Sequence, residues 1–200
     1  CEEIVEEYGE NYRYMRGGRN VSQSRNHGIG NSRGDYIAFL DSDDTWFADN
    51  LERKFEFLED NPDCSMVFSS FVTVFSEGET EEAKRFDGDI VGYLLKGRRI
   101  QTSAVMARKE SLVKAGMFDS DMPYWEDQDL WMKLSEEGRI GFIDEVLTVY
   151  NKRGDSRTNT GMEDILSYFM RFCDRHGDRL SDRGRTDIRS FVQRYTGKYL

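Results

Sequence analysis

The feature that most constrains this chain is an apolar run over residues 36–40 that ends directly in Asp41-Ser42-Asp43-Asp44. A strand with one solvated face alternates in polarity, whereas a strand that is apolar at every position is covered on both faces. Continuous apolar strands are typical of parallel sheets with helices on either side. We therefore expect a buried parallel strand whose carboxyl end carries three carboxylates.

The rest of the chain alternates between helical and extended patterns. Apolar residues at helical spacing and runs rich in β-branched and aromatic residues predict helices over 51–58, 109–115 and 126–137 and strands over 65–75 and 140–150. This alternation predicts an α/β fold with a mostly parallel sheet flanked by helices.

The sequence pattern changes after residue 150, where a polar segment is followed by two sets of apolar residues at helical spacing. We expect one domain over residues 1–158 and a small C-terminal helical tail over 159–200. The tail is net positive over residues 171–200, with charges at three- and four-residue steps that favour ion pairs on a solvated helical face. Weak contact with anionic lipid headgroups is the alternative, so membrane contact is at most peripheral.

Composition excludes several classes of protein. The chain has 28 Lys and Arg against 38 Asp and Glu, whereas a general nucleic-acid binder needs a positive surface. No apolar run approaches the roughly 18 residues of a membrane span. Cys1, Cys64 and Cys173 are too few and too widely spaced for a disulfide framework or a zinc site. We expect idle thiols in a reducing compartment, hence the cytoplasm or the inner face of its membrane.

The acidic sequence after the apolar run predicts a metal site. Carboxylates packed this densely repel one another unless a cation lies among them. Mg²⁺ and Mn²⁺ are typically held by one or two carboxylates together with substrate phosphates. Ligands of open α/β sheets bind at the carboxyl ends of the strands, where this sequence falls. The alternative is an acidic turn that only caps the next helix.

Two further segments carry residues suited to substrate binding or catalysis. Glu126 and Asp127 begin a predicted helix directly after Trp125, which suits a general base at a cleft rim beside an aromatic wall. Capping by carboxylates that favour the helix dipole, with a packed tryptophan, explains the same residues. Arg25, in a small-residue helix over residues 20–31, suits contact with a phosphate or lies on a plain amphipathic helix.

Three motifs follow one another in order: S-x-S-R-N-x-G-I from Ser22, G-D-Y-I-A-F-L-D-S-D-D-x-W from Gly34, and W-E-D-x-D-L-W-x-K-L from Trp125. In this order they resemble the family-2 glycosyltransferases of the GT-A fold, over residues 1 to about 158. The resemblance implies a metal-dependent, usually inverting transfer of a sugar from a nucleotide-diphosphate donor. The acceptor would be a glycan, a lipid-linked molecule or a small molecule.

The resemblance also implies roles by position in these motifs. Asp43 would hold the Mg²⁺ or Mn²⁺ ion at the donor diphosphate, and Asp127 would be the catalytic base. The remaining implied contacts are Arg25, Asn26 and Asp41 with the nucleotide-sugar or its metal, and Trp125 and Glu126 with the acceptor.

The sequence lacks two features that are found in this family, and each absence changes what we expect of the protein. The family normally begins with a strand and a D-D-G-S-type segment that hold the nucleoside, and neither precedes the first motif, so we expect a truncated domain. No Q-x-x-R-W motif is present, which predicts a non-processive enzyme. The alternatives are a non-catalytic binding module or inactive fragment of the same fold, and a Mg²⁺-dependent phosphotransferase, for which no P-loop motif is present.

Overall fold

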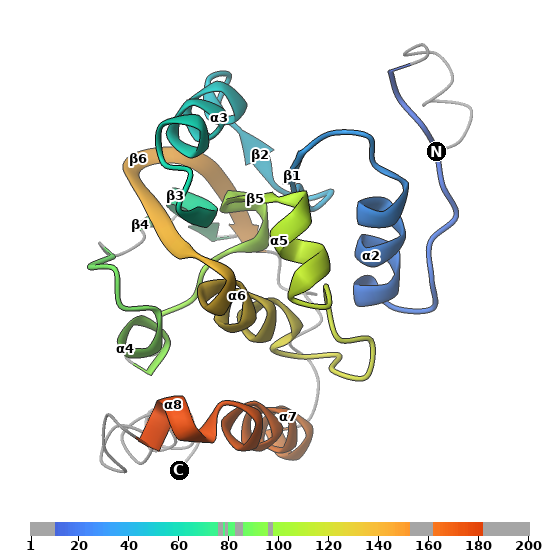
Figure 1. Ribbon diagram of the computed structural model, residues 1–200, viewed down its shortest axis with the longest axis vertical. Helices are drawn as coiled ribbons and strands as arrows, with labels where there is room; N and C mark the ends of the chain where they lie inside the picture. Colours follow the sequence, from blue (N-terminus) through green and yellow to red (C-terminus); the bar gives the residue numbers. More distant parts are fainter. Residues whose placement is uncertain are drawn as a thin grey trace.

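The computed structural model describes residues 11–75, 78, 80–82, 86–95, 98–152 and 162–181. In these residues a curved sheet lies at the centre, with α3 at one end and α2, α5 and α6 around it, and the last two helices lie beyond α6 (Figure 1). The helices are α2 (Val21–Asn31), α3 (Asn50–Asp60), α4 (Ile90–Leu95), η1 (Thr102–Ala104), α5 (Lys109–Lys114), α6 (Glu126–Glu137), α7 (Met162–Arg175) and α8 (Gly177–Ser181). The strands are β1 (Tyr36–Ala38), β2 (Thr45–Trp46), β3 (Cys64–Phe75), β4 (Thr80–Glu82), β5 (Val105–Arg108) and β6 (Arg139–Lys152).

The sheet mixes strand directions, with the order β1-β5-β3-β6-β2 and β4 paired to β3. Within the described residues only β3 and β6 pair in parallel, and the other four pairings are antiparallel. The α/β class is confirmed, but the expectation of a mostly parallel sheet is wrong. A continuous apolar run carries no information on the direction of the neighbouring strand. The expected burial over residues 36–40 is also incomplete, since Leu40 is 48% exposed. β1 is half-buried and lies antiparallel to β5 at one end of this order.

The parallel pair β3 and β6 forms the spine of the sheet. Their register runs from Cys64 opposite Arg139 to Phe75 opposite Lys152, with irregularities around Ser70. Gly138 closes α6 and leads into β6, and a Cβ there would lie 2.8 Å from the Asp63 carbonyl oxygen and 2.9 Å from the Ser65 nitrogen. Only glycine allows so close an approach of two backbones. This contact sets where α6 ends and β6 begins.

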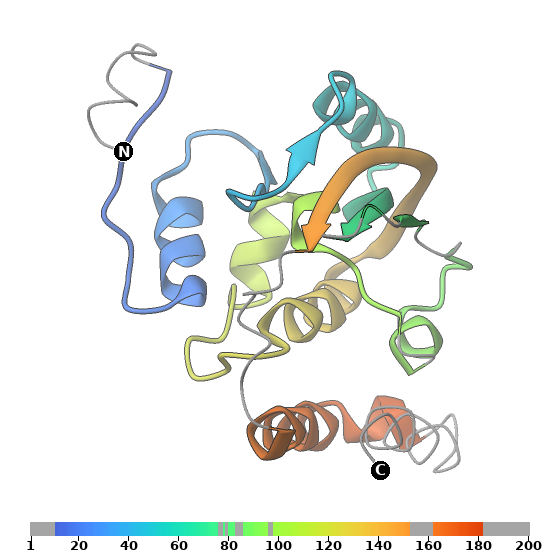
Figure 2. The ribbon, with the colours of Figure 1, turned by 180° about the vertical axis from the view of Figure 1, so that it is seen from behind.

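Helix α6 is the centre of the core. Leu130, Trp131, Met132 and Leu134 are fully buried, so this helix is covered on nearly every side. One hydrophobic cluster runs from Ile29 of α2, past α6, to Phe169 and Phe172 of α7. Both views place α7 and α8 along α6 (Figures 1 and 2). The expected boundary at residue 158 lies outside the described residues, yet α7 shares the core of the sheet.

No helix in the described part of the chain is long and apolar enough to cross a membrane. α7 spans 14 residues, whereas a membrane span needs about 20.

Lys54 of α3 is a charge-bearing residue that the fold buries completely. Its Nζ donates to Asn50 Oδ1 at 3.0 Å and lies 5.9 Å from the centre of the Trp46 ring. Burial lowers the pKa of this amine to about 7, because the protonated form loses its hydration. The folded protein therefore keeps Lys54 largely neutral above neutral pH.

This burial predicts a pH dependence of stability. Between pH 7 and about 10.5 the unfolded chain binds the Lys54 proton and the folded chain does not, so the free energy of unfolding rises with pH through this window. Lys54→Met removes this contribution, and its stability relative to the wild type should fall steadily as the pH rises. Urea unfolding at pH 7, 8 and 9.5 measures the difference. Lys114→Met, on an exposed lysine, is the control; parallel curves for wild type and Lys54→Met would contradict the prediction.

Candidate active site

The acidic turn Asp41–Asp44 connects strands at opposite ends of the sheet order and crosses the edge where β6 ends and β5 begins. The Asp44 nitrogen donates to the Asp41 carbonyl at 3.0 Å, which closes the turn. Ser103, just before β5, accepts from the Asp41 nitrogen at 3.0 Å and donates its hydroxyl to the Asp44 carboxylate at 2.5 Å. Ser103 thus ties both ends of the turn to the centre of the sheet.

The end of β6 also holds the turn. Asn151 donates from Nδ2 to the Asp43 carbonyl at 2.7 Å and from its backbone nitrogen to the Asp44 carboxylate at 3.2 Å. Burial raises the pKa of Asp44, the hydrogen bonds from Ser103 and Asn151 oppose that rise, and the charges of Asp41 and Asp43 add to it. Asp44 is therefore a structural carboxylate, and the fixed backbone leaves Asp41 and Asp43 as the ligand candidates.

Arg25 brings the three motifs together. Its Nη2 donates to both oxygens of Asp41, at 2.8 and 3.1 Å, and its Nη1 donates to Glu126 Oε1 at 3.3 Å. The guanidinium also lies 5.3 Å from the centre of the Phe118 ring and is largely buried. A single cation therefore joins the acidic turn after β1 to the first turn of α6.

Glu126 and Asp127 differ in their surroundings. Burial raises the pKa of Glu126 to about 7, the charge of Asp127 adds to the rise, and the charges of Arg25 and Arg99 oppose it. At neutral pH Glu126 is thus close to half protonated. Asp127 is mostly buried, and its Oδ1 accepts from the Gln128 nitrogen at 2.8 Å. Two adjacent carboxyl groups, one of them poised near neutrality, suit proton transfer at the start of α6.

Tyr150 and Arg99 belong to the same region, and sequence reasoning missed both. Burial raises the pKa of the Tyr150 hydroxyl, Arg99 lowers it, and the charges of Asp44, Asp43 and Asp41 raise it, so this side chain lies near the acidic turn. Arg99 is exposed and lies 5.9 Å from the centre of the Trp125 ring. The only signal in the sequence was that Tyr150 ends a long extended run.

Asn26 and Trp125 serve the packing of the site. The Asn26 amide accepts from the Phe118 nitrogen at 3.0 Å and donates to the Phe118 carbonyl at 2.8 Å, which fixes α2 to the loop before α6. The Trp125 ring is only 6% exposed and packs on Phe169 and Phe172. The structure supports the packing explanation of Trp125 over an open aromatic wall. For Asn26, its geometry gives no support to contact with a nucleotide.

The acidic turn offers few ligands for a divalent metal. Within the described residues, no three or more His, Cys, Asp or Glu side chains are grouped as a metal site. A Mg²⁺ or Mn²⁺ ion at a diphosphate needs only one or two carboxylates, with phosphate oxygens supplying other ligands. Asp43, half-buried on a backbone that Asn151 holds, fits that requirement, while Asp41 is already paired with Arg25.

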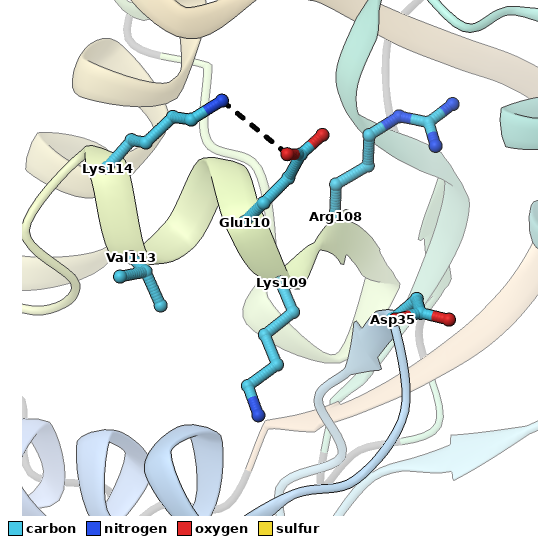
Figure 3. A pocket seen from close by; sticks show the side chains of 6 residues that line it. All are labelled: Asp35, Arg108, Lys109, Glu110, Val113 and Lys114. Carbon is cyan, nitrogen blue, oxygen red and sulfur yellow. Dashed lines mark ion pairs between the residues drawn. The ribbon is translucent and has the colours of Figure 1, made fainter.

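A separate hollow of the described surface lies away from the candidate site. A cavity of about 560 Å³ is lined by Asp35, Arg108, Lys109, Glu110, Val113 and Lys114 (Figure 3). It lies at the start of β1 and the end of β5, the ends of these strands remote from the acidic turn. Arg108 donates to the carbonyls of Cys64 and Leu58, and Lys114 pairs with Glu110 at 3.5 Å. These groups hold the fold, and the hollow is not part of the candidate site.

The family model named Glycosyl transferase family 2 matches residues 1–113, more than half of the chain. This chain belongs to glycosyl transferase family 2. Among relatives of this family, an uncharacterised glycosyltransferase of Rickettsia bellii is 31% identical over 161 residues, 74% of this chain and 23% of the relative. One from Methanocaldococcus jannaschii is 26% identical over 181 residues, 84% of this chain and 62% of the relative. The chain thus spans about a quarter of the length of the relatives from Rickettsia bellii and Rickettsia felis.

Solved structures agree on the fold. A structure of TarS from S. aureus in complex with UDP-GlcNAc matches with a TM-score of 0.70, over 98% of this chain and 60% of its own, at 17% identity. A mannosyltransferase of Pyrobaculum calidifontis in complex with GDP-Man and Mn²⁺ matches with a TM-score of 0.53, over 77% of this chain and 44% of its own, at 15% identity. The expected GT-A fold of family 2 is confirmed.

The position of Arg25 predicts how its loss destabilises the protein. Arg25→Ala leaves Glu126 buried without its cation, which should cost about 1–3 kcal/mol of the free energy of unfolding. Without Arg25 the pKa of Glu126 in the folded protein rises further, so the folded protein binds a proton there that the unfolded chain does not. The stability gained from this proton is lost as the pH rises. The cost should therefore be larger at pH 8 than at pH 6. Denaturant unfolding at both values measures it, with the exposed Arg33→Ala as control; a pH-independent loss would refute the assignment.

Proposed function

We propose that this chain is the greater part of an inverting, non-processive glycosyltransferase domain that moves a sugar from a nucleotide-diphosphate donor to an acceptor hydroxyl, with a divalent metal. One observation carries the proposal: Arg25 contacts both Asp41 and Glu126, so the acidic turn and the start of α6 face a common site. Family membership supports glycosyl transfer as the chemistry of that site.

The donor would bind at the acidic turn. Asp43 would hold the metal together with the donor diphosphate, and Asp41, kept in place by Arg25, would contact the ribose or the metal. A bound Mg²⁺ or Mn²⁺ supplies Lewis-acid stabilisation of the negative charge that grows on the leaving diphosphate. The bound UDP-GlcNAc in TarS, and the GDP-Man and Mn²⁺ in the Pyrobaculum enzyme, support a nucleotide-sugar donor and a metal.

The acceptor would bind at the start of α6. An alcohol is a poor nucleophile at neutral pH, and removal of its proton during attack accelerates the reaction. Asp127 would take this proton while the acceptor oxygen attacks the anomeric carbon from the side opposite the diphosphate, which inverts its configuration. Glu126, held by Arg25, would orient the acceptor hydroxyl beside Asp127.

The name of one relative and the charge of the chain support a class of acceptor. GgaA of Bacillus subtilis, 28% identical over 76% of this chain and 36% of its own length, is named a minor teichoic acid biosynthesis protein. This name supports a role in cell-envelope or glycan synthesis, with a glycan, a lipid-linked molecule or a small molecule as acceptor. The net charge of −10 makes nucleic acid an unsuitable partner. We propose action in the cytoplasm or at the inner face of its membrane.

The role of Asp43 is tested by donor binding. In the full-length protein, Asp43→Asn should abolish the Mn²⁺-dependent part of the affinity for UDP and GDP, because the amide binds a divalent cation far more weakly than the carboxylate. Titration calorimetry with and without Mn²⁺ measures this. Asp35→Asn, at the other end of β1, is the matched control. An unchanged Mn²⁺-dependent affinity in Asp43→Asn would remove Asp43 from the metal site.

The role of Asp127 is tested by turnover. A general base acts in the transition state, so Asp127→Asn should leave the affinity for Mn²⁺ with nucleotide within about twofold and lower turnover by roughly 10²–10⁴. Glu126→Gln should cost less, and the exposed Asp121→Asn should cost nothing. Sugar transfer by the full-length protein is measured beside a melting curve for each variant. Near-normal turnover in Asp127→Asn would place the base elsewhere, and a wild type that binds nucleotide without transfer would favour the binding module.

A further inference from the structure

The residue before Glu126 has an unusual backbone conformation. Trp125 has φ +68° and ψ +8°, in the left-handed region that bulky residues rarely adopt. Such a conformation costs energy and persists only where the surroundings enforce it, commonly at functional sites. Because Trp125 is the residue from which α6 starts, its backbone angles set the direction in which Glu126 and Asp127 project.

Helix α7 supplies the surroundings that enforce this conformation. The Trp125 ring packs on Phe169 with ring centres 5.2 Å apart and on Phe172 with ring centres 5.5 Å apart. Both phenylalanines are almost fully buried, as is Trp125 itself. The Trp125 carbonyl also accepts from the Asp129 nitrogen at 2.8 Å, which closes the first turn of α6. The aromatic contact therefore comes from a segment more than forty residues further along the chain.

An ionic cluster around the buried Asp129 holds the C-terminal end of α7 on the first turn of α6. Asp129 is 0% exposed, and its carboxylate contacts Lys133 Nζ at 3.0 Å, Arg175 Nη1 at 2.9 Å and His176 Nε2 at 2.9 Å. We call these four residues the Asp129 cluster. Arg175 reaches on to Asp119 in the loop before α6, at 2.6 Å. Burial alone would raise the pKa of Asp129, but the hydrogen bonds and charges of its three partners hold it at about 2.

The Asp129 cluster faces away from the candidate site. Residues two apart on a helix lie on different faces, so Asp129 cannot share the direction of Asp127. Its carboxylate is enclosed by α6 and the C-terminal helices, and substrate has no access to it. Any effect of Asp129 on catalysis must therefore act through the backbone of the first turn of α6.

We propose that Asp129 and Phe172 are positioning residues: by holding α7 against Trp125, they fix the first turn of α6 and so aim Glu126 and Asp127 at the acceptor. The catalytic consequence rests on the proposed function of the site, whereas the mechanical part concerns this chain alone. The C-terminal helices would then be a working part of the transferase domain. A mere stabilising role would leave the geometry of Glu126 and Asp127 unchanged in the folded protein.

The test compares two residues of α7 in the full-length protein. Phe172→Ala removes a ring from Trp125, and the matched control Met170→Ala alters a side chain that is 64% exposed on the same helix. Asp129→Asn is the second test variant and removes the carboxylate charge that pairs with Lys133 and Arg175. Phe172→Leu, which keeps most of the apolar volume, is the rescue. All measurements are made at least 15 °C below the melting temperature of each variant, so that every protein is folded.

Two readouts separate positioning from stability. We expect Phe172→Ala and Asp129→Asn to speed amide hydrogen exchange over residues 126–129 at least tenfold, with little change over residues 131–137. We expect sugar-transfer turnover to fall at least tenfold, the affinity for Mn²⁺ with UDP to stay within twofold, and Phe172→Leu to keep at least half of the turnover. A lower melting temperature with unchanged exchange and turnover would overturn the proposal. If the wild type transfers no sugar, the proposed function fails, and the exchange data still decide whether α7 fixes this turn.

Discussion

The candidate site depends on one largely buried cation. The guanidinium of Arg25 contacts both Asp41, in the acidic turn after β1, and Glu126, at the start of α6. Without it, two carboxylates from segments that are far apart in sequence would face each other across a poorly hydrated space, and their repulsion would open the site. The pairing of Arg25 requires α2 to lie beside the sheet edge. Asn26 helps to hold it there, because its amide fixes the helix to the Phe118 backbone. A residue first expected to bind the donor therefore also holds the site together.

The buried ionisable groups of this structure differ in the charge of their immediate neighbours. Asp129, which contacts the cations Lys133 and Arg175 and the ring of His176, is stabilised as a carboxylate and works as an anchor. Glu126 is buried beside the carboxylate of Asp127, and the charges of Arg25 and Arg99 compensate only in part, so its pKa stays near neutrality. Lys54 has an amide partner and an aromatic ring, and remains neutral above pH 7. These three ionisable groups are all buried, so the differences between their protonation states at neutral pH come from the charges of their neighbours.

Long periodic segments could be predicted from the sequence, whereas contacts between distant segments could not. The helix over 126–137 and the strands over 65–75 and 140–150 are confirmed almost to the residue, because each has a clear apolar pattern. The direction of β1 was missed because an apolar run carries no information on the direction of the neighbouring strand. Ser103 and Asn151 were missed because a serine or an asparagine has no pattern of its own; their importance comes from partners 59 to 108 positions away. The metal and base assignments to Asp43 and Asp127 stay predictions.

The path of the acidic turn has a consequence for how the domain folds. β1 and β2 are separated by only six residues in sequence, yet they occupy opposite ends of the sheet order, and the turn between them is tied to residues just before β5 and at the end of β6. Pairings between such distant segments form late, because the entropy of closing long loops must be overcome first. The geometry of the acidic turn is therefore absent from any partly folded chain that has not yet placed β6. In a nascent chain the proposed donor site therefore forms only after β6 has been synthesised, so nucleotide binding at that site would report completion of the whole sheet.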